Sequence, residues 1–354
     1  SLCYKKHNMN KKDSSVLKLK KLFSNKIISP IYSNFKFQLN SSIKKNIFLT
    51  AVSGGSDSLA LSALSKAYSE EKGNKVFYAL VDHGIRTNSS KEALAVKALL
   101  KKKGIFLNIL KNKKKINKNI QSNARKIRYE LLLNYCNKHK IKFIMTGHHR
   151  DDQIETFLIR LSRGSGIQGL SSMKKIVKLN NKIKLFRPLL GETKEGLTFL
   201  AKKYFGKIFN DPSNTNQKYL RTNIRNLIKQ FEKNGIKRDQ IIHSINNLAA
   251  TRDTLNSYIQ YIEKKCLIKK KNIVSIKLKP FFLENKDIQL KIFGNTLKHV
   301  SRTYYPPRAK KVLNLINRIK VKKEIIATLG GCIINKRQNS LVISKEELKK
   351  TIKL

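Results

Sequence analysis

The chain is 354 residues long and 40% hydrophobic, and its 76 lysines and arginines against 22 acidic residues give a formal net charge of +54. This length suffices for two or three domains with cores of their own, and no apolar run approaches the ~20 residues that a membrane span needs, which excludes a spanning helix. The charge favours a polyanionic partner such as RNA, because each neutralised phosphate releases counterions, although an AT-rich genome also produces a lysine-rich chain.

The first forty residues are basic and poor in acids, so we expect a basic extension over 1–40 that includes a first helix. A transit peptide is the alternative, and the missing initiator Met indicates that the true start lies elsewhere. The four cysteines (Cys3, Cys136, Cys266, Cys332) form no CxxC pair, which argues against a zinc site or an iron–sulfur cluster. Their scatter favours a reducing compartment, with the bacterial cytoplasm expected and an organelle as the minority alternative.

Apolar strands alternate with helical patterns from about residue 41 to residue 215. The expected strands are 47–52, 75–81, 104–109 and 141–146, and the expected helices are 57–69, 91–103, 121–139 and 151–162. Such alternation predicts an α/β domain with a parallel sheet and right-handed crossovers. Ligands bind such sheets beyond the carboxyl ends of the strands, and three polar segments fall at those ends: 53–58, 82–86 and 147–156.

The rest of the chain divides less sharply. Residues 163–190 are glycine-rich and then hairpin-like, 206–220 are loop-rich, 221–270 are helical, and a short strand pattern stands near 332–343. We therefore predict an α/β domain over 41–215, a helical domain over 216–290 and a small mixed region over 291–354.

The segment Ser53-Gly54-Gly55-Ser56-Asp57-Ser58 lies between a predicted strand and a predicted helix. A glycine turn of this kind aims backbone N–H groups and a helix N-terminus at one point, which favours a phosphate there. Asp57 would repel a phosphate unless a Mg²⁺ bridges the two. The string is neither a Walker A loop nor a dinucleotide fingerprint. The alternative is an ordinary turn with Asp57 or Ser58 as the N-cap.

Two further segments carry candidate polar residues. Asp82 and His83 end the second predicted strand, where they could reach the adenosine of a nucleotide; a polar turn is the alternative. His148, Asp152 and Glu155 have the i, i+4, i+7 spacing of one helix face, which suits metal binding or proton transfer.

The identity of a metal follows from the donor atoms. Carboxylate oxygens such as those of Asp57 and Asp152 suit Mg²⁺ better than Zn²⁺. The alternative is structural, because Asp151 and Asp152 would also stabilise the positive end of a helix.

Arginines stand out in a lysine-dominated chain. Arg125 and Arg128 are three residues apart on a predicted helix and face the same way, and Arg163, Arg221 and Arg225 follow in later segments. Arginine favours bidentate recognition of phosphate, whereas a solvated basic face is the alternative.

Together these strings resemble the tRNA(Ile)-lysidine synthetase family, within the wider group of PP-loop ATP pyrophosphatases. The matching segments are AVSGGSDSLAL, VDHGIR, NARKIRYELL, TGHHRDDQIETFLIRLSRGSGIQGL, FRPLL, DPSN with RTNIR, and TLGG at 328–331. They occur in family order over about 47–225, with a weaker echo near the C-terminus. Ile85 replaces the usual Leu, a change that should cost nothing.

The resemblance implies a Rossmann-like PP-loop fold, a helical tRNA-binding domain and an ATP- and Mg²⁺-dependent ligase. ATP adenylates the carbon-2 oxygen of the wobble cytidine in a CAU-anticodon isoleucine tRNA and releases pyrophosphate. Free lysine then attacks carbon-2 through its side-chain amine, and AMP leaves. The product base pairs with A rather than G, so the codon read changes from AUG to AUA.

The resemblance and the residue chemistry together assign roles. ATP contacts are expected from Ser53, Gly54, Gly55, Ser56, Asp57, Ser58, Asp82 and His83. Asp57, Arg125, His148 and Asp152 are expected at the reacting centre, with Asp57 and Asp152 as Mg²⁺ ligands. Asp152 could instead accept a proton from the lysine ammonium. Arg128, Glu155, Arg163, Arg221 and Arg225 are expected on the side of the tRNA and the substrate.

Three alternatives remain at this point. Another PP-loop tRNA-modifying enzyme would share the glycine loop, although a thiolase usually brings paired cysteines. A GMP or NAD synthetase would leave the arginine strings unexplained. A non-catalytic, basic RNA-binding protein would need neither ATP nor lysine. A homodimer is possible.

Overall fold

The computed structural model describes residues 21–44, 46–85, 88–112, 120–209, 220–270, 273–303 and 306–346. Residues 1–20 of the predicted basic extension, Arg86 and the DPSN segment at 211–214 lie outside the described residues. The chain divides into two compact units, one through Asn247 and one from Leu248 onward. Among the described helices, none combines the length and the apolar character that crossing a membrane requires.

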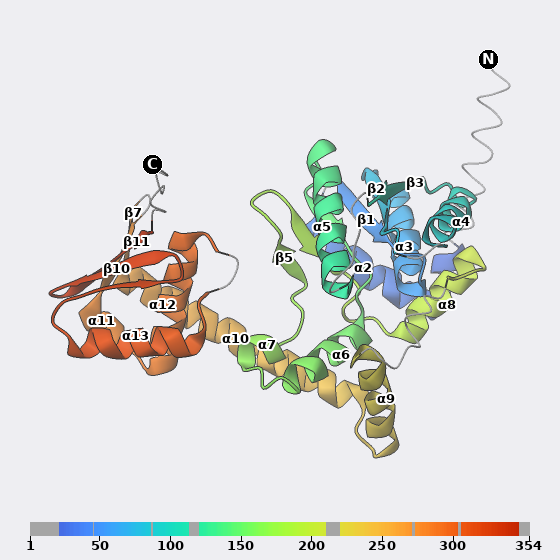
Figure 1. Ribbon diagram of the computed structural model, residues 1–354. Helices are drawn as coiled ribbons and strands as arrows, with labels where there is room; N and C mark the ends of the chain where they lie inside the picture. Colours follow the sequence, from blue (N-terminus) through green and yellow to red (C-terminus); the bar gives the residue numbers. More distant parts are fainter. Residues whose placement is uncertain are drawn as a thin grey trace. The chain divides into compact units, whose positions relative to one another are not determined.

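A six-stranded sheet in the order β3-β2-β1-β4-β6-β5 forms the centre of the first unit (Figure 1). Its strands are β1 (Phe48–Val52), β2 (Val76–Asp82), β3 (Leu107–Lys111), β4 (Phe143–Met145), β5 (Ile176–Lys178) and β6 (Lys184–Phe186). All neighbouring strands are parallel except β5, which pairs with β6 as an antiparallel hairpin. The predicted parallel α/β sheet is confirmed. The strand order reverses between β1 and β4, where such sheets bind ligands.

Consecutive residues of β1 face opposite sides of the sheet, as the strand period requires. Phe48 belongs to one core, with α2 (Ile28–Ser42), α3 (Ser56–Lys72), α4 (Ser89–Lys101) and α8 (Lys194–Phe205). Leu49 belongs to the core on the other face, which α5 (Ile120–Lys138) covers. Helix α3 is buried on most sides and is rich in Ala and Ser, which lets it lie between the sheet and α8.

Two elements differ from the predicted ones. Helix α8 occupies a segment for which no element was predicted, although Thr193 caps it and Gly206 ends it in the left-handed conformation, with φ of 76°. Strand β3 begins later than predicted, because Gly104 with φ of 69° belongs to the turn that ends α4. The first difference is a helix that was not predicted, and the second is a shifted strand boundary.

A smaller cluster of helices continues from β4. Helix α6 (Arg150–Leu161) packs its Ile154 and Leu158 against Ile224 and Ile228 of α9 (Leu220–Lys233). The first turns of α10 (Arg238–Cys266) complete this core through Ile245. The short helix α7 (Ile167–Leu170) follows α6 directly in the chain. Helix α6 therefore connects the end of β4 to a helical layer.

The second unit is built on an antiparallel sheet in the order β7-β8-β11-β10-β9. Its strands are β7 (Leu267–Lys270), β8 (Ile273–Lys277), β9 (Ile325–Leu329), β10 (Cys332–Arg337) and β11 (Ser340–Lys345), and its helices are α11 (Leu278–Phe282), α12 (Lys286–Ser301) and α13 (Ala309–Val321). Phe281, Phe293 and Ile334 lie in their shared core. The helical region and the mixed C-terminal region are as predicted in kind, while the predicted boundaries at 216 and 291 stay predictions.

Candidate active site

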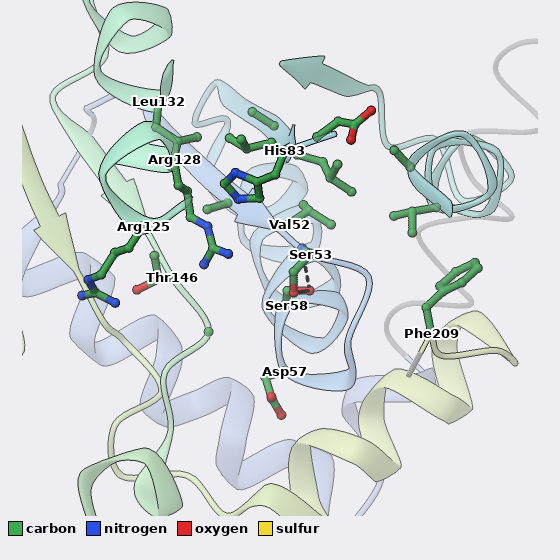
Figure 2. Close-up of a pocket in the computed structure, with 18 of the residues that line it drawn as sticks. Val52, Ser53, Asp57, Ser58, His83, Arg125, Arg128, Leu132, Thr146 and Phe209 are labelled. Atoms are coloured by element: carbon green, nitrogen blue, oxygen red, sulfur yellow. Dashed lines mark hydrogen bonds between the residues drawn. The ribbon is translucent and has the colours of Figure 1, made fainter. Parts of the chain in front are cut away.

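A pocket of about 360 Å³ opens at the carboxyl ends of β1, β2 and β4, next to the reversal in strand order. Residues from all three predicted ligand segments line it, together with two arginines of α5. From the predicted set these are Ser53, Asp57, Ser58, Asp82, His83, Arg125, Arg128, His148 and Asp152. Figure 2 shows Arg128 extending from α5 toward the loop at Ser53 and Ser58, with Phe209 across the pocket.

Hydrogen bonds within the glycine loop fix its conformation. Ser58 Oγ accepts from the backbone N–H of Ser53 at 3.0 Å and donates to the carbonyl of Gly55 at 3.0 Å. Gly54 has φ of 88°, and a Cβ there would lie 2.8 Å from Val96 Cγ2, so only glycine fits. Helix α3 begins at Ser56 with Gly55 as its N-cap and no side-chain cap. Neither Asp57 nor Ser58 is the N-cap, and the first N–H groups of α3 lack a capping side chain.

Asp57 stands in the first turn of α3 beside the side chains of Lys194 and His149. Lys194 Nζ donates to both carboxylate oxygens at 2.7 Å, and His149 Nε2 lies 3.6 Å from Oδ2. Burial alone would raise the pKa of Asp57, but the hydrogen bonds and charges of His149 and Lys194 lower it to about 2. The carboxylate is therefore ionised at any working pH.

His149 joins two carboxylates at the start of α6. Its Nδ1 accepts from the backbone N–H of Asp151 at 3.2 Å, and its own backbone N–H donates to Asp152 Oδ2 at 3.0 Å. This capping box needs a lone pair on Nδ1, so the ring proton of the neutral form sits on Nε2. Nε2 lies 3.6 Å from both Asp57 Oδ2 and Asp152 Oδ2. Burial lowers the pKa of His149, but these carboxylates raise it above the ordinary value.

His148 does not share a helix face with Asp152 and Glu155, which corrects the prediction from their spacing. Helix α6 begins at Arg150, so His148 precedes it, and its Nδ1 lies 2.8 Å from Thr146 Oγ1. Burial lowers its pKa to about 4; Arg187, Arg125 and Arg221 add to this effect, and Asp152 opposes it. The His148 ring is neutral at pH 7.

Glu155 is buried in an ion pair outside the pocket lining. Its Oε1 accepts from Arg225 Nε at 2.6 Å, and its Oε2 lies 3.8 Å from Arg221 Nε. Glu155 is only 3% exposed, so this pair ties α6 to α9. Arg163 lies after the end of α6 and is exposed. None of these four predicted residues is among those that line the pocket.

His83 projects two unsatisfied nitrogens into the pocket region. Its Nδ1 and Nε2 are both buried and find no hydrogen-bond partner among the described residues, whereas such groups normally have one. Burial lowers the pKa of His83, and the charge of Arg128 adds to this. Asp82 beside it is already engaged, since it accepts from the Gly84 N–H at 3.1 Å and from Ser90 Oγ at 2.5 Å. His83 is thus the residue of this pair that a ligand would satisfy.

Gly147 brings the turn after β4 against the glycine loop. A Cβ on Gly147 would lie 2.9 Å from both the carbonyl carbon and the oxygen of Asp57 and 3.1 Å from Ser58 N. The missing side chain therefore sets the spacing between the two polar turns. His149 and Lys194 were not among the predicted site residues; His149 stands inside a predicted motif, whereas Lys194 follows FRPLL in the helix that was not predicted.

Comparison with known proteins adds to this geometry. Residues 25–231 match the PP-loop domain family. The tRNA(Ile)-lysidine synthase of Wolbachia pipientis wMel is 33% identical over 314 residues, which cover 87% of this chain and 72% of that relative. The tRNA(Ile)-lysidine synthase of Orientia tsutsugamushi (strain Boryong) is 34% identical over 84% of this chain and 69% of the relative.

A solved structure shares the fold. The U34-tRNA thiolase NcsA from Methanococcus maripaludis, which carries a [4Fe-4S] cluster, superimposes with a TM-score of 0.54 at 20% identity. The match covers 63% of this chain and 79% of that protein. At this identity the likeness concerns the fold alone.

We expect Gly147→Ala to weaken ATP binding about tenfold or more, because a Cβ forces the two turns apart and small misplacements at a site are costly. Isothermal titration calorimetry would measure the affinity. Gly191→Ala is the matched control, since a Cβ there meets no atom within 4 Å and the residue has no positive φ. Equal affinities for both variants and the parent protein would contradict the close packing at Gly147.

We expect the His148 ring to titrate with a midpoint of about 4, because burial and nearby arginines disfavour its charged form. Side-chain NMR of the nucleotide-free protein between pH 3 and pH 8 would measure this, with His148→Gln assigning the signal. His149 should titrate above its ordinary value in the same spectra. A His148 midpoint near 6.5 would mean that its ring is solvated.

Proposed function

The chain belongs to the tRNA(Ile)-lysidine synthase family of PP-loop proteins, and we propose that it ligates free lysine to carbon-2 of the wobble cytidine in CAU-anticodon isoleucine tRNA. ATP first adenylates the carbon-2 oxygen and releases pyrophosphate; the side-chain amine of lysine then displaces AMP. The observation that carries this proposal is the convergence of the glycine loop, His83, His148 and Asp152 on one pocket.

The triphosphate would bind at the start of α3. The uncapped N–H groups after Gly55 supply donors, and the positive end of the helix dipole favours an anion there. Gly54 lets the backbone approach the phosphates without a side chain in between. Donors fixed before the substrate arrives stabilise the charge that develops as pyrophosphate leaves.

The adenosine would occupy the part of the pocket near β2. His83 has two buried nitrogens that no residue in the described part of the chain satisfies, and a base edge or a ribose hydroxyl would do so. Phe209 lies on the pocket wall across from α5 (Figure 2) and offers a ring for apolar contact. This placement leaves the α-phosphate between the glycine loop and His148.

The donor set fits a Mg²⁺ ion. Asp57 and Asp152 each place an oxygen 3.6 Å from the same nitrogen of His149, so the two carboxylates lie close together beside the loop. Proteins usually hold Mg²⁺ through one or two carboxylates together with substrate phosphates. When bound, the ion would neutralise charge on the phosphate oxygens. His149 orients both carboxylates through its ring and its backbone N–H.

The lysine amine must lose its proton before it can attack, because a free lysine side chain has a pKa of about 10.4. Asp152 lines the pocket next to His148 and is the proposed acceptor, if the metal leaves its carboxylate available. His148 is neutral and hydrogen-bonded to Thr146, so it can contact the reacting base without adding charge. Burial around this point also favours the neutral amine.

The arginines near His148 favour the phosphates of the tRNA. Arg125 and Arg128 line the pocket on α5, while Arg187 is buried and donates to the Lys174 carbonyl at 2.6 Å. Arg187 Nε has no hydrogen-bond partner among the described residues. We propose that this positive region binds the backbone around the wobble cytidine, whereas the helical part of the chain binds the rest of the tRNA. A bacterial cytoplasmic location and a possible homodimer complete the proposal.

Incorporation of labelled lysine tests the proposed function. The protein is incubated with ATP, Mg²⁺, radiolabelled lysine and an isoleucine tRNA transcript with a CAU anticodon. We expect ATP-dependent label in the RNA and none in a matched transcript with U in place of the wobble cytidine. The proposal would be contradicted by label that enters the RNA without ATP, by equal label in the transcript with U, or by no label at all.

We expect Asp57→Asn to reduce tRNA-dependent release of pyrophosphate about a hundredfold, because the loop loses the charge that would hold Mg²⁺. Binding of tRNA should change little, since Asp57 lies inside the nucleotide pocket. A pyrophosphate release assay and a filter-binding assay would measure the two effects. Unchanged turnover would refute the metal role of Asp57.

A further inference from the structure

Lys194 makes the shortest described contacts to the glycine-loop carboxylate. Its ammonium donates to both oxygens of Asp57 at 2.7 Å, across 137 positions of the chain. Lys194 is the first residue of α8, the helix that packs along α3. The interaction therefore joins the start of one helix to the start of another, at the loop where the phosphates would bind.

Helix stability does not explain a lysine at this position. The N-terminus of a helix carries partial positive charge, so a cation in the first turn is disfavoured and an acid such as the adjacent Glu195 is preferred. The side chains of Lys194 and Asp57 are 40% and 25% exposed. An ion pair this open to solvent contributes little to folding.

The two oxygens that Lys194 holds are the ones a metal would need. An ammonium bound to both oxygens competes with a Mg²⁺ ion at the same carboxylate, because each takes lone pairs of these oxygens and the two positive charges repel each other. His149 holds the carboxylate less closely than Lys194 does, since its Nε2 stays 3.6 Å from Oδ2. We therefore expect a metal that binds Asp57 to displace the Lys194 ammonium.

A displaced Lys194 would find the phosphates within reach. Its ammonium already stands beside the first turn of α3, where uncapped N–H groups favour an anion. Lysine has a flexible four-carbon stem and three donors that can rotate, so it can move from one anion to another without a change in the backbone.

We propose that Lys194 is a cationic residue of the phosphate site. Lys194 binds Asp57 until a divalent ion takes that carboxylate, and its ammonium then binds the phosphate oxygens. This inference rests on the proposed function for the use of ATP, but it concerns only the metal and the phosphates. In the free protein Lys194 balances the charge of Asp57. In the loaded protein the metal balances Asp57, and Lys194 faces the triphosphate.

Two binding measurements on Lys194→Met test the proposal. Without nucleotide, we expect Mn²⁺ to bind the variant more tightly than the parent, by about tenfold, because its competitor is gone; electron paramagnetic resonance would count free Mn²⁺. With Mg²⁺ present, we expect pyrophosphate to bind more weakly, by about tenfold, in calorimetry. Lys202→Met on the same helix is the control, since the Lys202 side chain is exposed, and it should change neither affinity.

The opposite signs of these two shifts separate the proposal from a structural role. A lysine that only stabilises the packing of α3 and α8 would weaken both bindings or neither, and either result overturns the proposal. If Lys194→Met fails to fold, Lys194→Gln should give the same two shifts and Lys194→Arg should give neither. Incorporation of lysine into tRNA by the parent protein reports on the proposed function separately, because the two binding measurements involve neither tRNA nor lysine.

Discussion

The close approach of Gly147 to the backbone of Asp57 is the contact on which the rest of the site depends. It lets the turn after β4 lie directly on the start of α3, with 2.9 Å between a would-be Cβ and the Asp57 carbonyl. Because the two turns touch, His149, which lies beside Asp152 in the capping box of α6, also reaches Asp57, and His148 reaches the pocket. A side chain at this one position would separate the phosphate loop from the residues that face the reacting base.

The neighbours of each side chain in the pocket determine whether it is charged or neutral. Asp57 is ionised because Lys194 and His149 stand beside it, whereas His148 is neutral because it is buried among arginines. Asp57 at the start of α3 is thus paired with Lys194, whereas Arg125 and Arg128 supply positive charge on the α5 side of the pocket. Such an arrangement suits a reaction that binds two polyanions, ATP and tRNA, while a neutral amine must attack between them.

The sequence predicted the α/β sheet and the three ligand segments because both depend on local patterns. Apolar runs such as 47–52 mark buried strands, and parallel strands bring their carboxyl ends to one edge of the sheet, so 53–58 and 147–156 had to meet. Contacts between distant elements lacked such a signal. Lys194 meets Asp57 only through the packing of α8 on α3, and Glu155 meets Arg225 only through the packing of α6 on α9.

The roles of His148 and His149 depended on a boundary that composition does not set. A helix that begins at Arg150 makes His149 the cap and leaves His148 outside, whereas a start two residues earlier would place both on its surface. Residues share a helix face by spacing only if the helix includes all of them. The spacing of His148, Asp152 and Glu155 therefore did not establish a shared face, because it does not say where α6 begins. The side chain of Glu155 turned instead toward α9.

A crystal structure with Mg²⁺ and a non-hydrolysable ATP analogue tests the account most directly. We expect the β- and γ-phosphates within hydrogen-bond distance of the backbone N–H groups at the start of α3, and the adenosine against His83. Nucleotide bound elsewhere, with the loop from Ser53 to Ser58 making no contact to phosphate, would contradict it.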